Sequence, residues 1–411
     1  MKSFFSRIKK LQWKHLLTVF FIVFIFAIGA LGLPTAMITI GTHVKEDPLN
    51  FPSLIEKLKE DYTEIMPFAG PPPINRGHYI DLNGFIANAI GQRFMNDRVK
   101  LDNGNLAYLG SDKEEGYPVN SLAIAENLSK LCQVQQERGG EFLFVLAPMQ
   151  APKYEQEIIP AGYTDYNTPQ ADALMEAIEA MNIPSMDLRT LLHEQGITQK
   201  EAFFVTDHHW RPETGFWAFG EMLSYFENTG AITELDHSLL DIENYDVKTY
   251  EDYFLGSAAI RTGPYYAGID DFSIITPKFE THMTVDIPSK DFHREGSFSE
   301  TAYSDTHMGN TTFYTAFPYE KYGHSDKGLI QYRNENAPIK KKIMTIGDSF
   351  TNTSTTFFPL CVQSCDELDM RFYTQDFTEH FEEYNPDILI VMITASTLVQ
   401  ENTLYPFVVE K

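Results

Sequence analysis

The stretch IMTIGDSF, residues 343–350, is an apolar run that ends abruptly in Gly-Asp-Ser. A short continuous apolar run is typical of a strand that is covered on both faces of a sheet. Gly347 permits a sharp turn after such a strand, which would leave Ser349 at the carboxyl edge of the sheet with neighbouring backbone N–H groups exposed. Gly, Asp and Ser are also common in ordinary turns, so the motif alone is a weak functional signal. It becomes specific only together with a second motif.

The stretch TDHHW, residues 206–210, supplies that second motif. It follows the apolar run 203–205, which predicts a strand, and it precedes a predicted helix. In extended backbone, Asp207 and His209 share one face and His208 points to the other. A carboxylate beside an imidazole fixes the tautomer of the ring and stabilises its charged form. Two alternatives stay open, because Asp207 can instead cap the following helix, or Asp207 and the two histidines can bind a metal.

The chain around these motifs alternates between helical periodicity and short apolar runs. Strands that are separated by helices indicate a parallel sheet with helices on both faces. The sequence therefore predicts an α/β domain with three layers, α/β/α, and a parallel sheet. The helical stripes lie at residues 124–132, 174–181 and 216–226, and the predicted strands lie at residues 142–146, 183–188, 203–205, 343–346 and 388–393.

Residues 235–340 differ from this pattern. They are rich in Tyr, Asp, Gly and Thr and lack long helical periods, so we expect a β-rich or loop-rich insertion that lies against the α/β core. Aromatic rings crowd the insertion. Sugars stack on such rings, which makes a glycan groove one interpretation, and core packing is the simpler one. The tyrosines concerned are Tyr253, Tyr265, Tyr266, Tyr314 and Tyr319.

Composition excludes several classes of protein. The 411 residues are 43% hydrophobic, which is enough for a packed core, and the net charge of −25 argues against nucleic acid as a partner. Three cysteines cannot support a disulfide scaffold. Cys361 and Cys365 are four residues apart on a predicted helix, which favours free thiols or a strained bond. Asp366 and Glu367 are interpreted as part of a solvated face.

The first forty residues predict the compartment. Residues 1–15 carry five cations and no acid, and residues 16–40 carry no charge at all. As a helix the second segment would rise about 37 Å, more than the roughly 30 Å of a hydrocarbon core. The positive-inside rule then predicts a cytoplasmic basic tail at 1–15, a transmembrane signal anchor at 16–40 and an extracytoplasmic remainder, with a linker at 41–75 and one domain at 76–411. A cleaved signal peptide is the alternative.

The two motifs carry a resemblance to known families. Residues 347–350 look like the first block of the SGNH (GDSL-type) hydrolases, and TDHHW resembles the signature of the DHHW protein family. TDHHW is also similar to the Asp-x-His-Trp motif of the SGNH-like acetyltransferases of bacterial alginate O-acetylation. The order of the motifs, with Asp and His before Ser, matches that acetyltransferase group, whereas ordinary SGNH hydrolases place Ser first. The resemblance covers roughly residues 76–411.

The resemblance implies roles for individual residues. Ser349 would be the nucleophile, His209 the base and Asp207 the group that orients the base, with Trp210 packed beneath the site. The SGNH pattern also expects a glycine and an asparagine that donate to an oxyanion. The candidates for binding oxyanion or substrate are Asn310, Asn352 and Arg371, of which Arg371 would meet a substrate carboxylate or a sugar hydroxyl unless it forms a surface salt bridge.

These inferences together predict acyl transfer. We expect O-acetyl addition to, or removal from, a cell-envelope or exported polysaccharide through an acyl-serine, with no cofactor and no metal. The resemblance implies one protein partner, a multi-pass membrane O-acyltransferase that exports the acyl group. Two rivals stay open: a non-catalytic glycan-binding or assembly protein with the same fold, and a metallohydrolase built on Asp207, His208 and His209.

Overall fold

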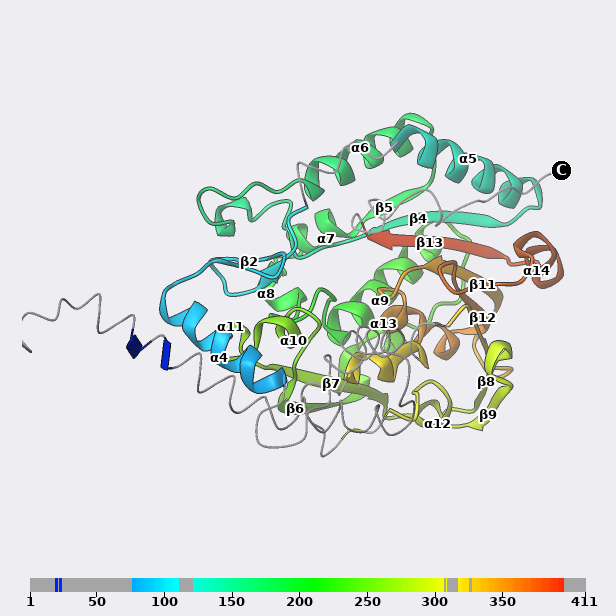
Figure 1. Ribbon diagram of the computed structural model, residues 1–411. Coiled ribbons are helices and arrows are strands. Elements are labelled where there is room, and N and C mark those ends of the chain that lie inside the picture. Colours follow the sequence, from blue (N-terminus) through cyan, green and yellow to red (C-terminus); the bar gives the residue numbers. More distant parts are fainter. Residues whose placement is uncertain are drawn as a thin grey trace, which may run out of the picture. The chain divides into compact units, whose positions relative to one another are not determined.

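The computed structural model in Figure 1 describes most of the chain after residue 75. By its backbone contacts the chain divides into two compact units, residues 1–83 and 84–411. The first unit contributes a few helical residues near position 20 and the start of helix α4 (Arg76–Ala89), and the second contains the sheets and both motifs. The described residues are 19–20, 22–23, 76–110, 121–306, 308, 317–324 and 327–394.

An eight-stranded mixed sheet forms the centre of the second unit. Five parallel strands come first in the sheet, and three antiparallel strands extend it beyond β12. In spatial order the strands are β5 (Ser185–Asp187), β4 (Glu141–Ala147), β13 (Ile388–Thr394), β11 (Ile339–Gly347), β12 (Val362–Asp369), β10 (Leu329–Arg333), β8 (Met283–Ile287) and β9 (Phe292–Gly296).

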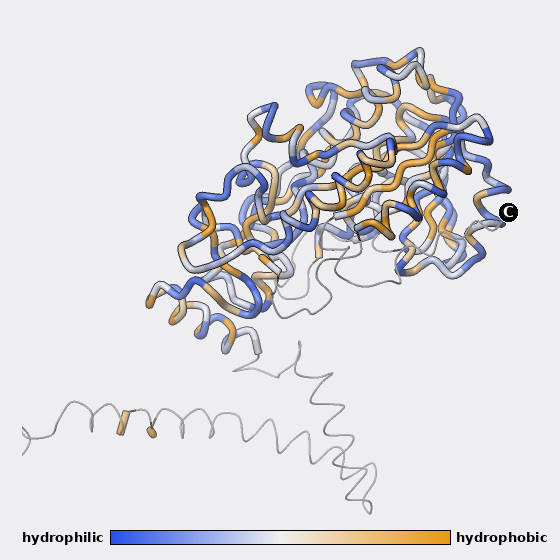
Figure 2. The backbone as a smooth tube through the Cα atoms, turned by 90° about the horizontal axis from the view of Figure 1, so that it is seen from above, coloured by the Kyte–Doolittle hydropathy of each residue, from blue (hydrophilic) through white to orange (hydrophobic). Residues whose placement is uncertain are grey.

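Helices cover both faces of the parallel part of the sheet (Figure 1). One core packs α5 (Ser121–Glu137), α6 (Asn167–Ala180) and α14 (Phe377–Tyr384) against one face, and a second packs α7 (Leu188–Glu194) and α9 (Pro212–Asn228) against the other. Along β4 the buried side chains alternate between the two cores, since Phe144 enters the first and Val145 the second. Figure 2 shows the resulting interior, with the most hydrophobic segments running through the middle of the unit. The predicted α/β layering is therefore confirmed.

The prediction of a purely parallel sheet is wrong, because the insertion contributes strands to the sheet itself. Strands β8, β9 and β10 all come from residues 235–340 and pair antiparallel, with β10 on the edge of β12. The insertion also forms a separate two-stranded sheet of β6 (Tyr245–Phe254) and β7 (Asp270–Pro277). Antiparallel strands can add to the edge of a parallel sheet without a helical crossover, so helical periodicity gave no sign of them.

Shorter elements complete the described part. A small antiparallel sheet contains β1 (Phe94–Met95), β2 (Arg98–Lys100) and β3 (Leu106–Ala107). The short helices are α8 (Gln199–Ala202), α10 (Ala259–Thr262), α11 (Pro264–Ala267), α12 (Phe298–Thr301) and α13 (Asn352–Thr355). Short 3₁₀ segments are η1 (Gln156–Ile158), η2 (His237–Leu240), η3 (Ile242–Asn244), η4 (Pro288–Lys290), η6 (Phe358–Leu360) and η5 (Pro318–His324), the last of which is kinked.

Two local predictions near the end of the chain are wrong for one reason. Residues 362–369 form a strand rather than a helix, and it lies between β11 and β10. Asp366 and Glu367 are therefore buried, where Arg333 pairs with Asp366 at 2.6 Å and the Thr351 hydroxyl donates to Glu367 at 2.8 Å. All three cysteines of the chain are buried free thiols.

The segments predicted before residue 76 are mostly outside the described residues. This applies to the tail at 1–15, the linker at 41–75 and the anchor at 16–40, apart from four helical residues of the anchor. Among the residues that the structure describes, no helix is both long and apolar enough to cross a membrane.

Candidate active site

Strand β11 delivers Ser349 to the carboxyl edge of the sheet. The strand ends at Gly347, and the next residue, Asp348, accepts the Phe350 N–H at 3.0 Å. The other oxygen of Asp348 accepts both the N–H and the hydroxyl of Thr394, each at 3.0 Å, at the end of the neighbouring strand β13. Asp348 thus stabilises the turn and connects it to strand β13. These hydrogen bonds fix the position of Ser349 in the turn.

The segment before Asp207 is held by side chains from distant parts of the chain. Residues 203–205 form no strand of the sheet, and only an isolated bridge joins Phe203 to Trp210. The carboxylate of Asp270, at the start of β7, accepts the N–H groups of Val205 at 3.0 Å and Thr206 at 2.7 Å. The predicted strand at 203–205 is therefore wrong. The N–H of Val205 binds the Asp270 side chain, and those of Phe203 and Phe204 bind the nearby carbonyl oxygens of Gln199 and His209 instead of a strand of the sheet.

Asp207 faces His209 through a turn rather than through an extended strand. Its Oδ1 accepts the backbone N–H of His209 at 3.0 Å and lies 2.6 Å from the Nδ1 of the same residue. Its Oδ2 accepts the N–H of Ser257 at 2.6 Å. Gly256 makes this approach possible, since a side chain there would collide with Asp207. The two residues that the sequence paired are thus paired, but by a different local geometry.

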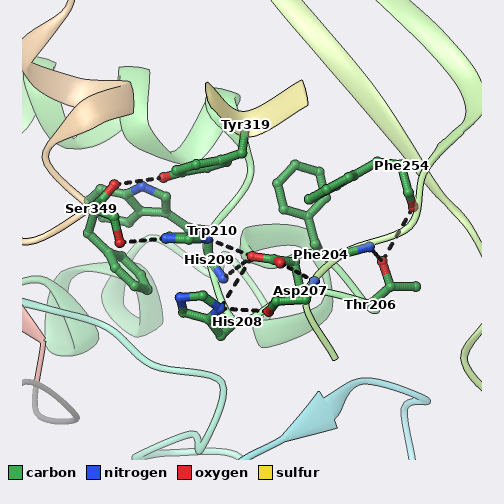
Figure 3. A network of polar contacts seen from close by, with 12 residues as sticks. Phe204, Thr206, Asp207, His208, His209, Trp210, Phe254, Tyr319 and Ser349 are labelled. Atoms are coloured by element: carbon green, nitrogen blue, oxygen red, sulfur yellow. Dashed lines mark hydrogen bonds and ion pairs between the residues drawn. The ribbon is translucent and has the colours of Figure 1, made fainter. Parts of the chain in front are cut away.

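The side chains of Ser349 and His209 face each other and are hydrogen-bonded (Figure 3). Ser349 Oγ lies 2.7 Å from His209 Nε2, and the two residues are 140 positions apart in the chain. A carboxylate can only accept, so the proton between Asp207 and His209 belongs on Nδ1, and Nε2 is left to accept the serine hydroxyl. The structure therefore brings Asp207, His209 and Ser349 into one hydrogen-bonded chain.

The environment keeps Asp207 ionised. Burial by itself would raise the pKa of this carboxyl, but the charges of the two histidines and the hydrogen bonds from His209 and Ser257 hold the pKa well below its usual range. The side chain is almost fully buried. Asp207 thus remains a carboxylate at neutral and mildly acidic pH, in the form that stabilises a positive charge on its neighbour.

His208 lies beside the other histidine, which corrects the expectation that it points away. Its ring centroid is 3.8 Å from that of His209, and its Nδ1 lies 2.9 Å from Ser257 Oγ. The side chain is 46% exposed, far more than that of His209. Asp207, His208 and His209 bring potential metal ligands within 4.8 Å of one another. Both ring nitrogens of His209 already have partners, Asp207 at Nδ1 and Ser349 at Nε2. A metal bound to His209 would therefore have to replace one of these two hydrogen bonds.

Trp210 packs beneath the site as predicted. It is fully buried, its ring centroid lies 5.4 Å from that of Phe350, and its Nε1 donates to Thr353 Oγ1 at 2.7 Å. Thr353 belongs to the short helix α13 that follows the Gly-Asp-Ser turn. The hydrogen bond from Trp210 therefore links the TDHHW motif to the helix that follows the Gly-Asp-Ser turn.

The three remaining site candidates are not all brought to this chain of hydrogen bonds. Asn310 lies outside the described residues. Asn352 is buried at the start of α13, three positions after Ser349, and packs against Gly323. Arg371 pairs with Asp369 through its Nε at 2.9 Å and its Nη2 at 2.5 Å, so the salt-bridge alternative describes it.

Several residues of the site carried no signal in the sequence. Besides Asp270 and Ser257, they include Gln150, whose amide donates to the carbonyl oxygens of Phe204 and Asp207. These three are single polar residues in loops or at an element end, where no periodicity distinguishes them. Tyr319, which the sequence offered only as one of the tyrosines of the insertion, has its ring against His209.

Part of the site lies within the range of a known family model. Residues 112–229, which include TDHHW, match the family model of the SGNH hydrolase-like domain of the acetyltransferase AlgX. The matched residues are similar to this family of SGNH-like acetyltransferases. The resemblance drawn from the sequence is thereby confirmed. Comparison with curated proteins gives no match.

Solved structures share the fold of the SGNH-like domain. PatB1 of Bacillus cereus superposes with a TM-score of 0.57 at 18% identity, over 70% of this chain and 93% of that one. The same protein with a sulfonyl adduct gives 0.56 at 18% identity, over 68% and 91%. A DHHW family protein from Eubacterium siraeum gives 0.54 at 17% identity, over 75% and 95%. These likenesses establish the fold.

Proposed function

We propose that the protein is an extracytoplasmic, serine-dependent O-acetyltransferase or acetylesterase that acts on a cell-envelope or exported polysaccharide. The observation that carries the proposal is the hydrogen-bonded chain from Asp207 through His209 to Ser349, at distances of 2.6 and 2.7 Å. A serine hydroxyl is a weak nucleophile until a base takes its proton, and this arrangement supplies the base. The homology to SGNH-like O-acetyltransferases supports the acetyl group as the group transferred.

The geometry gives each residue a role in the first half of the reaction. Ser349 Oγ attacks the carbonyl carbon of an acetyl ester while its proton moves to His209 Nε2. Asp207 stabilises the imidazolium through Nδ1 and stays ionised. As the tetrahedral intermediate collapses, the ester C–O bond breaks, and His209 returns the proton to the leaving oxygen. The products are acetyl-Ser349 and the free alcohol.

The second half runs the same steps with a new nucleophile. His209 takes a proton from a sugar hydroxyl or from water, that oxygen attacks acetyl-Ser349, and the serine leaves with the proton. A sugar hydroxyl gives transfer, and water gives hydrolysis. The backbone N–H of Ser349 has no hydrogen-bond partner among the described residues, so it is free to donate to the oxyanion. No cofactor enters either half.

The alternative function, a non-catalytic glycan-binding or assembly protein, makes the opposite prediction for covalent labelling. We expect the full chain to hydrolyse p-nitrophenyl acetate and to be inactivated by a serine-directed phosphonate. Mass mapping should place the label on the peptide that contains Ser349. A protein that takes no label and still binds polysaccharide would contradict the proposal and support the alternative.

The proposed topology places the SGNH-like domain outside the cytoplasm. The basic residues at 1–15 and the uncharged run at 16–40 support a signal anchor, and a multi-pass membrane O-acyltransferase is the proposed acyl donor. Protease added to intact cells should degrade the chain after residue 40 and leave residues 1–15 protected. Finding the domain protected inside intact cells would contradict this topology, and a processed protein in the medium would support a cleaved signal peptide instead.

A further inference from the structure

Tyr319 lies directly on the base although it belongs to the insertion. Its ring stacks on the imidazole of His209 with centroids 4.0 Å apart and planes inclined by 16°. The ring of His208 covers the other side of the same imidazole (Figure 3). Tyr319 is 6% exposed, so its ring is a fixed part of the interior. His209 is thus enclosed on both faces as well as bonded at both nitrogens.

The hydroxyl of Tyr319 reaches the nucleophile's backbone. It donates to the carbonyl oxygen of Ser349 at 3.3 Å and lies 3.3 Å from Thr353 Oγ1, the oxygen that accepts the Trp210 indole N–H. Burial holds the pKa of Tyr319 well above its usual value, so the hydroxyl stays protonated and able to donate. One side chain therefore contacts the base through its ring and the serine residue through its hydroxyl.

We infer that Tyr319 is a positioning residue that holds His209 in the rotamer in which Nε2 faces Ser349 Oγ. The inference rests on the proposed function. The bond from Nδ1 to Asp207 fixes one end of the imidazole but permits the ring to tilt about that end, and a stacked ring on the buried side prevents the tilt. A displacement of about 1 Å costs on the order of 100-fold in rate, because proton transfer needs the two atoms within hydrogen-bond reach.

Three variants separate the ring, the hydroxyl and simple loss of stability. Tyr319→Met fills much of the volume with a flexible chain and removes the stacked ring, whereas Tyr319→Phe keeps the ring and removes the hydroxyl. Tyr322→Met is the matched control, since Tyr322 is also fully buried in η5 and donates instead to the carbonyl oxygen of Ser273 at 3.0 Å. We expect Tyr319→Met to lower kcat for p-nitrophenyl acetate by about 10–100-fold with KM little changed. Tyr319→Phe should stay within about tenfold of the parent, and Tyr322→Met should lower the melting temperature without that loss of kcat.

A spectroscopic measurement tests the positioning without turnover. The proton shared by Asp207 and His209 Nδ1 should give a far-downfield proton NMR resonance in the parent and in Tyr319→Phe, and it should broaden or vanish in Tyr319→Met. If the parent shows no turnover but the resonance follows this pattern, the proposed function fails and the positioning stands. Equal losses of kcat in Tyr319→Met and Tyr322→Met would overturn it. Loss of the resonance in Tyr319→Phe would overturn it too, even if Tyr319→Met does not fold.

Discussion

Ser349→Ala is expected to lower acetyl turnover by about 10⁴–10⁶-fold, because the nucleophile and its base act as one unit. The same change should alter the free energy of unfolding by no more than about 1 kcal/mol. Ser349 has a negative backbone φ, which alanine also adopts, and among the described residues its hydroxyl bonds only to His209. Steady-state hydrolysis of p-nitrophenyl acetate and a thermal melt of the same preparation measure both quantities.

The double variant supplies a control for this result. Ser349→Ala combined with His209→Ala should be scarcely slower than either single change, since each already removes the whole unit. Two independent losses that multiply would show that the residues do not act together. Turnover that survives Ser349→Ala would refute the acyl-serine and return attention to Asp207, His208 and His209 as a metal site, for which loss of activity in a chelator is the next observation.

His209→Ala and His208→Ala form the second pair, with very different expected effects. His209 connects Asp207 to Ser349, so its removal should lower turnover by about 10⁴-fold or more. His208 covers one face of that ring but forms no hydrogen bond with Ser349 in the described part of the chain. Its replacement should cost less than about tenfold, as expected for a lost packing contact. Initial rates of phosphonate labelling for the two variants give the comparison.

The opposite ranking would overturn the assignment of the base. If His208→Ala abolished labelling and His209→Ala left it, His208 Nδ1 would have to leave Ser257 and approach Ser349. The Ser257→Ala variant makes this distinguishable, because it removes the present hydroxyl partner of His208 and leaves the backbone N–H that binds Asp207. We expect Ser257→Ala to behave like His208→Ala.

The parts of the fold that follow from hydrophobic pattern were predictable. The apolar run that becomes β11 ends in Gly347, and this alone placed Ser349 at the edge of a sheet. The helical stripe at 216–226 likewise became α9, because burial of one helical face leaves a period that sequence displays. Such patterns arise when an element buries its own side chains, as both β11 and α9 do.

Contacts between distant segments left no comparable pattern. The pairing of Asp207 with His209 was inferred from an extended chain, yet it arises from a turn that Asp270 and Ser257 hold in place. The β-rich or loop-rich character of the insertion was expected, but the joining of its strands to the main sheet was not. Strand β10 gains its place from the edge of β12 rather than from its own periodicity. Asp366 looked solvated because its burial depends on Arg333 across that pairing.

The pairing of β10 with β12 has a consequence for how the chain reaches its native state. Until the insertion has docked, β12 would present a long row of unpaired backbone groups beside an apolar core, which is a template for association between chains. The N–H that Ser257 donates to Asp207 would also be missing, since Ser257 lies in the same insertion. During refolding, helical signal should thus return earlier than catalytic competence, with aggregation greatest in the interval between them.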